Sequence, residues 1–296
     1  MRASMLEAAA AATKALLYAG LLSCAGAAFA NATLRLSADA AAFVAQVVRR
    51  GALLTICAAL TGAAVLALRL GDEIDATILS AVFVSSAGAA TALQLAGAVL
   101  LLTTTGMDAF ARTTQAFNAA VAMASFAFTG HAASVGLIEG LVAFVHASAA
   151  AWWVGALWAL RYECAHSMQE DLAAVVEHFS RKAVVVIGAL VLAGIVLIFV
   201  LVDFARVPAL TPYAQVLILK IAAAALVLAL ATYNKFRLTP RLLAREGAAT
   251  TALRRSIVGE LTLVGVMTVI TAILTTYLSP QREEGPVDAR LQEEIR

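Results

Sequence analysis

The chain alternates between long apolar runs and short polar connections. A helix needs about 20 apolar residues to cross a bilayer, and eight runs approach or exceed that length. Short segments of strictly alternating polarity, which are typical of membrane β-barrels, do not occur in the sequence. The pattern therefore predicts an all-α, polytopic membrane protein with about eight transmembrane helices, at residues 12–32, 51–70, 78–103, 114–132, 141–160, 183–202, 213–234 and 257–278.

Composition agrees with this interpretation. Hydrophobic residues make up 62% of the chain and charged residues 14%, whereas a soluble protein is about half apolar and a quarter charged. The lipid bilayer is thus an expected partner, and the net charge of +2 gives no reason to expect nucleic acid binding. We expect one membrane domain, with four helices in residues 1–140, four in 141–280 and a polar tail at 281–296.

Basic residues predict the orientation of the helices, because short cytoplasmic loops are enriched in Lys and Arg. The opposite loops hold only Arg69 and Arg206, so both termini are expected in the periplasm of a bacterial inner membrane. Lys14 opposes this orientation, and residues 28–30 resemble a signal-peptidase site whose cleavage would leave seven helices. The loops after the first, third, fifth and seventh runs contain Arg35, Arg49, Arg50, Arg112, Arg161, Arg181, Lys182, Lys235, Arg237, Arg241, Arg245, Arg254 and Arg255.

Two histidines in apolar surroundings are the strongest candidates for chemistry. His131 ends the fourth run and His146 lies just inside the fifth, so antiparallel helices would place both imidazoles near the periplasmic face. Met123 precedes His131 by eight residues and would share its helix face. Imidazole and thioether groups suit copper, as Cu(I) or Cu(II), and we predict a copper site at these three residues. The alternatives are that each histidine bonds a neighbouring helix and that Met123 packs in the core.

Other polar residues could belong to an ion path. Trp153 lies two turns below His146 on the same helix face, where it could act as a gate or as a packing residue. Lys220 and Glu260 lie within apolar runs, where ionisable groups are usually functional or paired. For Glu260 the alternatives are an ion pair with a nearby arginine and a place at the cytoplasmic exit. A weaker candidate for a cytoplasmic metal site is the sequence Cys164, His166 and Met168, for which a solvated loop is the alternative.

No enzyme signature accompanies these residues. The sequence has no hydrolase nucleophile elbow, no nucleotide-binding loop and no CxxC pair. We therefore expect a protein that is not an enzyme.

The second half of the chain resembles the copper resistance protein D (CopD) family. The resembling segments are TGHAA, HASAAAWWVGALWAL, HFSRKAVVVIGALVLAGIV, YAQVLILKIAAAALVLALATYNKFRLTP and LRRSIVGELTLVGVMTVITAIL, in order from Thr129 to Leu278. Ala156 departs from the family, which often has a second glycine there. The positions that match the family are His131, His146, Trp153, Lys220, Asn234 and Glu260. Asn234 is therefore expected in the ion path together with Trp153, Lys220 and Glu260.

This resemblance implies an eight-span inner-membrane protein that moves copper from periplasm to cytoplasm, with a separate periplasmic copper-binding partner of the CopC type. Two alternatives stay open on the sequence. One is a haem-binding electron-transfer protein of the membrane, although haem bound by two histidines needs facing histidines nearer the middle of the helices. The other is a copper assembly or sensing factor that transports nothing.

Overall fold

The computed structural model describes residues 2–71, 75–104, 106, 108–129, 136–201 and 211–278. These residues form helices and no strand, which confirms the predicted all-α membrane fold. The elements are α1 (Arg2–Thr33), α2 (Ala38–Leu70), α3 (Ala76–Val84), α4 (Ser86–Thr103), α5 (Ala109–Met123), the 3-10 segment η1 (Ala124–Phe128), α7 (Leu137–His166), α8 (Gln169–Leu201), α9 (Pro212–Tyr233), the π-helical segment η2 (Asn234–Leu238), α10 (Thr239–Leu243) and α11 (Gly247–Tyr277).

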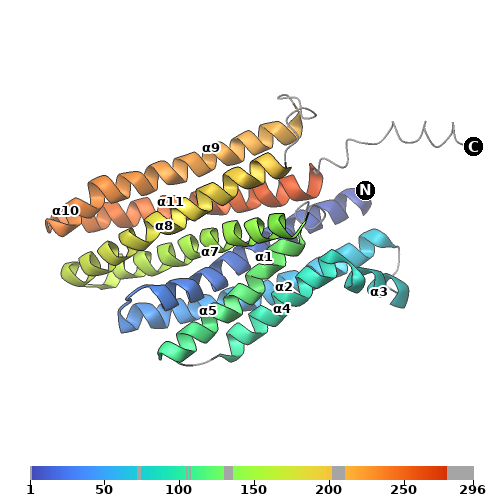
Figure 1. Cartoon of the computed structure of the whole chain (residues 1–296), viewed down its shortest axis with the longest axis horizontal. Helices are drawn as coiled ribbons and strands as arrows, with labels where there is room; N and C mark the ends of the chain where they lie inside the picture. The colour runs from blue at the N-terminus through green and yellow to red at the C-terminus, as the bar shows by residue number, and fades with distance from the viewer. Residues whose placement is uncertain are drawn as a thin grey trace, which may run out of the picture.

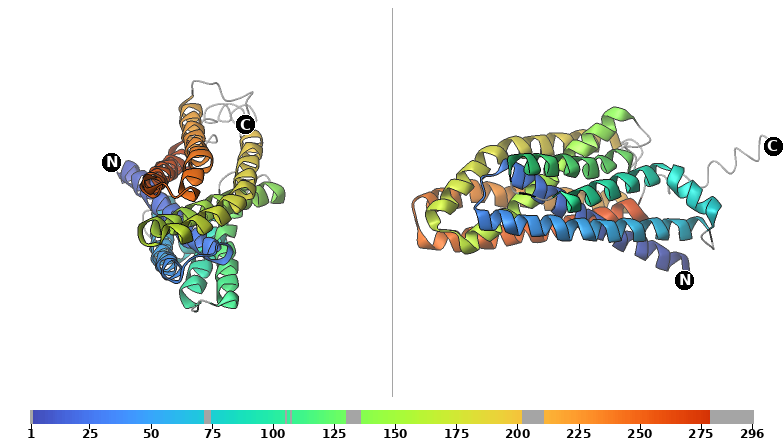
Figure 2. Two further views of the ribbon diagram at one scale, coloured as in Figure 1. Left: turned by 90° about the vertical axis from the view of Figure 1, so that its left-hand side faces the viewer. Right: turned by 90° about the horizontal axis from the view of Figure 1, so that it is seen from below.

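The helices run side by side along the long axis of the molecule (Figure 1). Helix α1 is central, since it packs against α2 and α5 on one side and against α7 and α11 on the other. Helix α8 packs against α7 and α10, whereas α9 packs against α11 and η2. Figure 2 shows α8 diverging from α9 and α11 along the bundle. The possible cleavage site at residues 28–30 therefore lies within the central helix, where Ala28 and Ala30 are fully buried.

Seven of the described helices are long and apolar enough to cross a membrane, so the predicted count of eight is approximate. The predicted run 114–132 is α5, which has 15 residues, followed by η1. Helix α5 alone is shorter than a full span. The run 78–103 is interrupted at Ser85, whose hydroxyl accepts from the backbone N–H of Gly88 and caps α4. A side chain that bonds the local backbone in this way competes with helix continuation.

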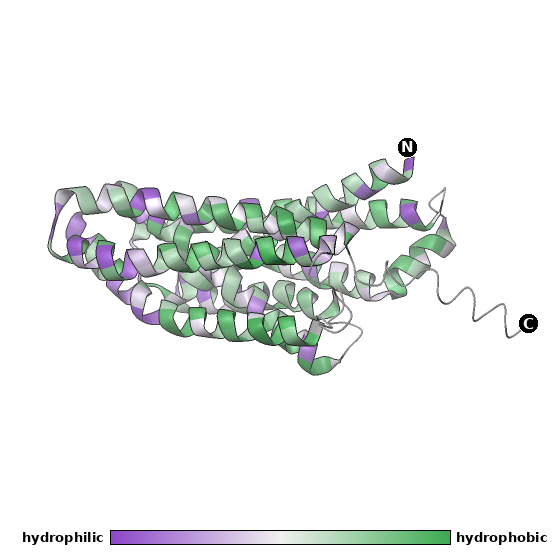
Figure 3. Cartoon of the chain, turned by 90° about the horizontal axis from the view of Figure 1, so that it is seen from above, coloured by the Kyte–Doolittle hydropathy of each residue, from purple (hydrophilic) through white to green (hydrophobic). Residues whose placement is uncertain are grey.

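Several helices are longer than the apolar runs that predicted them. Helix α2 begins at Ala38, well before residue 51, and α8 begins at Gln169, well before residue 183. The added residues are rich in good helix formers, chiefly Ala in α2 and Ala, Glu and Gln in α8, so the helices continue past the apolar runs that predicted them. Figure 3 shows hydrophilic residues gathered at the end of the bundle that carries the α7–α8 and α10–α11 connections. We call this the cationic end; the N-terminus of α1 lies at the opposite end (Figure 1).

Small residues allow the helices to approach closely. A Cβ on Gly155 of α7 would lie 1.9 Å from the carbonyl carbon and oxygen of Gly26 on α1. The α1–α2 crossing is similar, because a Cβ on Gly51 would lie 2.8 Å from the backbone nitrogen of Cys24. The backbones of α1 and α7 are therefore in direct contact, at a level close to Trp153.

A buried carboxylate fixes the cationic end of the bundle. Glu163 on α7 is fully buried, and its Oε1 accepts from the backbone N–H of Ser37 at 2.9 Å. Its Oε2 accepts from the hydroxyl of Ser167. Ser37 in turn caps α2, accepting from the backbone N–H of Ala40. Glu163 thus ties the α1–α2 connection to the end of α7.

Candidate functional site

His146 lies on the side of α7 that faces α8, about 14 Å from the start of the helix at 1.5 Å per residue. Its Nδ1 is 3.0 Å from the backbone oxygen of Leu190. A carbonyl oxygen can only accept, so Nδ1 carries the hydrogen and Nε2 of the neutral ring keeps its lone pair. Gly194 makes room for the ring, since a Cβ there would lie 3.1 Å from Cε1 of His146. This arrangement orients the ring and leaves Nε2 able to bind a metal ion.

The other residues of the predicted entrance are placed differently. His131 lies outside the described residues. Lys220, on α9, is a cation whose charge acts on the His146 ring. As an ammonium group it has three donors and no lone pair, so it is not a metal ligand in that form.

Met123 is the last residue of α5. The next five residues form the 3-10 segment η1. A 3-10 helix has three residues per turn, so the regular helix that the eight-residue spacing assumed ends at Met123, while His131 lies outside the described residues. Met123 is fully buried in an apolar cluster that includes Leu21 and Leu101.

The three residues of the predicted cytoplasmic site lie in different surroundings. Cys164 is buried in the apolar cluster around Trp152 and Leu172. The His166 ring stacks on Tyr162 with centroids 4.1 Å apart, and its Nδ1 is 2.9 Å from the Tyr162 carbonyl oxygen. Met168 is 76% exposed.

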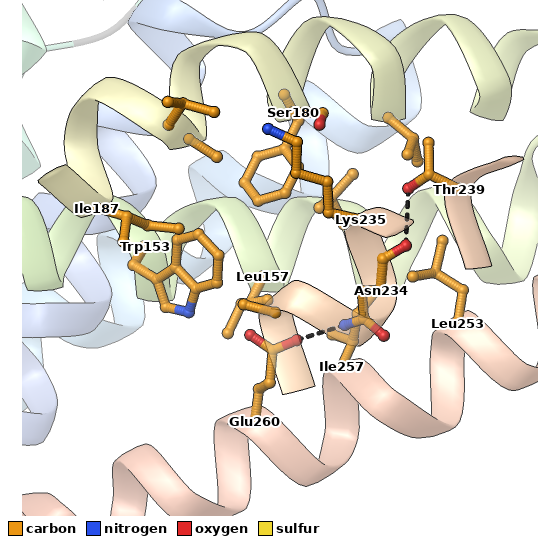
Figure 4. A pocket seen from close by; sticks show the side chains of 16 residues that line it. Trp153, Leu157, Ser180, Ile187, Asn234, Lys235, Thr239, Leu253, Ile257 and Glu260 are labelled. Carbon is orange, nitrogen blue, oxygen red and sulfur yellow. Dashed lines mark hydrogen bonds between the residues drawn. The ribbon is translucent and has the colours of Figure 1, made fainter. Parts of the chain in front are cut away.

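Three of the predicted path residues meet in one cavity near the cationic end. Trp153 of α7, Asn234 of η2 and Glu260 of α11 all line it, and the indole of Trp153 packs on Phe179 of α8. The cavity volume is about 60 Å³. Figure 4 shows these side chains around the cavity, with Lys235 and Ser180 among the remaining lining residues. Trp153 is about 10 Å further along α7 than His146, and both residues contact α8.

Glu260 has an amide partner in place of the expected arginine. Its Oε1 accepts from Nδ2 of Asn234 at 2.6 Å. Within the described part of the chain neither Arg254 nor Arg255 forms an ion pair with this carboxyl, because both arginines are exposed on α11 and Glu260 is 1% exposed. The ion-pair alternative is therefore wrong for Glu260.

A local change of helix type brings Asn234 to this position. Residues 234–238 form a π-helix, in which the backbone N–H of Thr239 donates to the Asn234 carbonyl five residues earlier. The Thr239 hydroxyl donates to the same oxygen at 3.0 Å. Pro240 follows directly, and a proline ring clashes with the carbonyl of the fourth residue before it. The widened turn accommodates Pro240, and π segments of this kind occur frequently at functional sites.

Sequence reasoning missed Gly194, Ser180 and the backbone carbonyl of Leu190. A glycine in a membrane helix indicates close approach but does not show which side chain approaches. The proline at 240 was the available signal for the π segment.

Comparison with known proteins adds a family to this geometry. Among the described residues no group of three or more His, Cys, Asp or Glu side chains is placed to hold a metal ion. No curated protein and no solved structure matches the chain. Residues 173–274 match the family model described as copper resistance protein D. The match confirms the resemblance predicted from the sequence, and it relates the part of this membrane protein from α8 to α11 to the copper resistance protein D (CopD) family.

Proposed function

We propose that this protein carries copper across a bacterial inner membrane, from periplasm to cytoplasm, as a substrate held by His131 and His146. The observation that supports the proposal best is the hydrogen bond of His146 to Leu190. It orients the ring in the tautomer that presents Nε2 as a ligand, and a second histidine would complete a two-coordinate site suited to Cu(I).

The orientation of the bundle supports the proposed direction. Lys and Arg concentrate in the sequence around the α7–α8 and α10–α11 connections at the cationic end, which the positive-inside rule places in the cytoplasm. His146 then lies on the periplasmic side of the cavity, and both face the contact between α7 and α8. A copper ion bound at His146 would have about 10 Å of α7 to pass before it reached Trp153.

Lys220 fits a gating role in this proposal. Its charge acts on the His146 ring and would repel a copper ion bound there. A separate periplasmic protein of the CopC type would deliver copper to the entrance.

Uptake of copper into liposomes tests the proposal. Purified protein is reconstituted into liposomes that enclose a copper chelator, and copper uptake is compared for the wild type and the double variant His131→Ala, His146→Ala. Uptake by the double variant should fall to the level of empty liposomes. His178→Ala is the matched control, because this histidine bonds the Thr33 carbonyl at the cationic end, and it should retain uptake.

Two other results would replace the proposal. Wild-type rates in the double variant would exclude the histidines as the entrance. Copper bound by the purified protein without any uptake would favour an assembly or sensing factor, and a haem absorption spectrum would favour electron transfer.

A further inference from the structure

Three buried polar atoms around the cavity at Glu260 have no hydrogen-bond partner in the protein. They are Nε1 of Trp153, Oδ1 of Asn234 and Oε2 of Glu260. Trp153 is 6% exposed and Glu260 is 1% exposed. Buried polar groups without partners are rare and usually indicate a bound molecule such as water.

The three atoms together match the bonding capacity of water. The indole N–H can only donate, and the amide and carboxylate oxygens can accept. In Figure 4 the nitrogen of Trp153 lies on the side of its ring that faces Glu260. The indole N–H is near enough to act on the carboxyl, but the two groups are not within direct hydrogen-bond geometry, which leaves room for a bridging water. A cavity needs about 10–15 Å³ to hold a water molecule, and the 60 Å³ of this cavity is enough for several.

No cation of the described part of the chain forms an ion pair with Glu260. Among the described residues that line the cavity, α7 and α8 contribute no charged side chain, η2 contributes Lys235, and α11 contributes Glu260 itself. Lys235 does not form an ion pair with Glu260 in the described structure, and its Nζ lies 5.8 Å from the centroid of the Phe236 ring. An unpaired carboxylate in apolar surroundings is costly, and binding a proton removes that charge.

We propose that Glu260 is a proton-exchange site, which takes up and releases a proton through water held in this cavity. The proton binds the lone pair of Oε2, while Oε1 stays bonded to Asn234. On release, the O–H bond breaks, its electron pair stays on Oε2, and the cavity water receives the proton. Arg255 is exposed on α11 about 8 Å from Glu260 along the helix axis, so the route to the cationic end is short.

Infrared difference spectroscopy on copper-free protein tests this inference apart from copper transport. Spectra of the protein in lipid nanodiscs are recorded at acidic and alkaline pH, in H₂O and in D₂O. The wild type should show the C=O stretch of a protonated carboxylic acid, which disappears at alkaline pH and shifts in D₂O. Glu260→Gln keeps the size of the side chain and should lose this band. Asn234→Leu should move the band to higher frequency, because the carbonyl of the acid loses a hydrogen bond.

Glu163→Gln is the matched control, since Glu163 is equally buried but both its oxygens already accept hydrogen bonds. This variant should retain the band. The inference is overturned if Glu260→Gln keeps the band, if the band does not respond to pH, or if it does not shift in D₂O. Each variant is first checked for a monodisperse elution profile, and Asn234→Leu provides a second test if Glu260→Gln fails to fold.

Discussion

The contact between α1 and α7 predicts that one added methyl group destabilises the whole bundle. In Gly155→Ala the new Cβ would lie 1.9 Å from the carbonyl carbon of Gly26. Carbon atoms in contact prefer a separation of about 3.5–4.0 Å, so the two helices would have to part by roughly 1.5–2 Å. The obstructing atoms belong to the backbone, which has no rotamer to change.

The expected loss is large for such a small substitution. Overpacking usually costs about 1–3 kcal/mol, and a clash between backbones belongs at the upper end, so we expect about 3 kcal/mol. Gly188→Ala on α8 is the control, because nothing lies within 4 Å of a Cβ at that position. Alanine is favoured over glycine in a helix by about 1 kcal/mol, so the control should be neutral or slightly more stable.

Denaturation of both variants in detergent measures the difference. The folded fraction is followed by tryptophan fluorescence as SDS is added, since Trp152 and Trp153 lie beside the α1–α7 contact. Because both variants gain the same helix propensity, they should differ by about 3 kcal/mol in free energy of unfolding, which is the cost of overpacking. Equal midpoints for Gly155→Ala and Gly188→Ala would refute the close backbone contact.

Further substitutions test other contacts. Glu163→Ala removes the acceptor of the part-buried hydrogen bond from the Ser37 N–H and should cost about 0.5–1.5 kcal/mol; an unchanged denaturation midpoint would contradict this. Gly194→Val places a side chain against the His146 ring, and it should weaken copper binding, measured by competition with a chelator, while the elution profile stays monodisperse. Pro240→Ala removes the ring that the π segment accommodates. Because Asn234 in this segment bonds Glu260, the infrared band of the cavity carboxyl should shift. An unchanged band would mean that Pro240 is not the cause of the π segment.

The fold class could be predicted from sequence because the apolar runs are long. The ends of the helices could not be predicted, because the apolar runs do not show how far each helix continues beyond them. Helix α2 shows this most clearly, with its start at Ala38 instead of residue 51. The break at Ser85 depended on a local hydrogen bond, which no periodicity reveals.

The candidate site was predictable only in part. Trp153, Asn234 and Glu260 were each selected as path residues, but the sequence did not show that they line one cavity. That required the π segment, which turns Asn234 toward α11. Met123 was aligned with His131 by assuming a regular helix, and the regular helix ends at Met123, where the 3-10 segment begins.

The central position of α1 has a consequence for how the protein is made. This helix leaves the ribosome before the other described helices, yet two of the helices that enclose it, α7 and α11, are synthesised long after it. Contacts between segments so distant in the chain form slowly, and partly enclosed intermediates are prone to misassembly. A nascent chain stopped before α11 would expose the small-residue surface of α1 to lipid, so quality-control proteases in the membrane should remove such fragments faster than the complete protein.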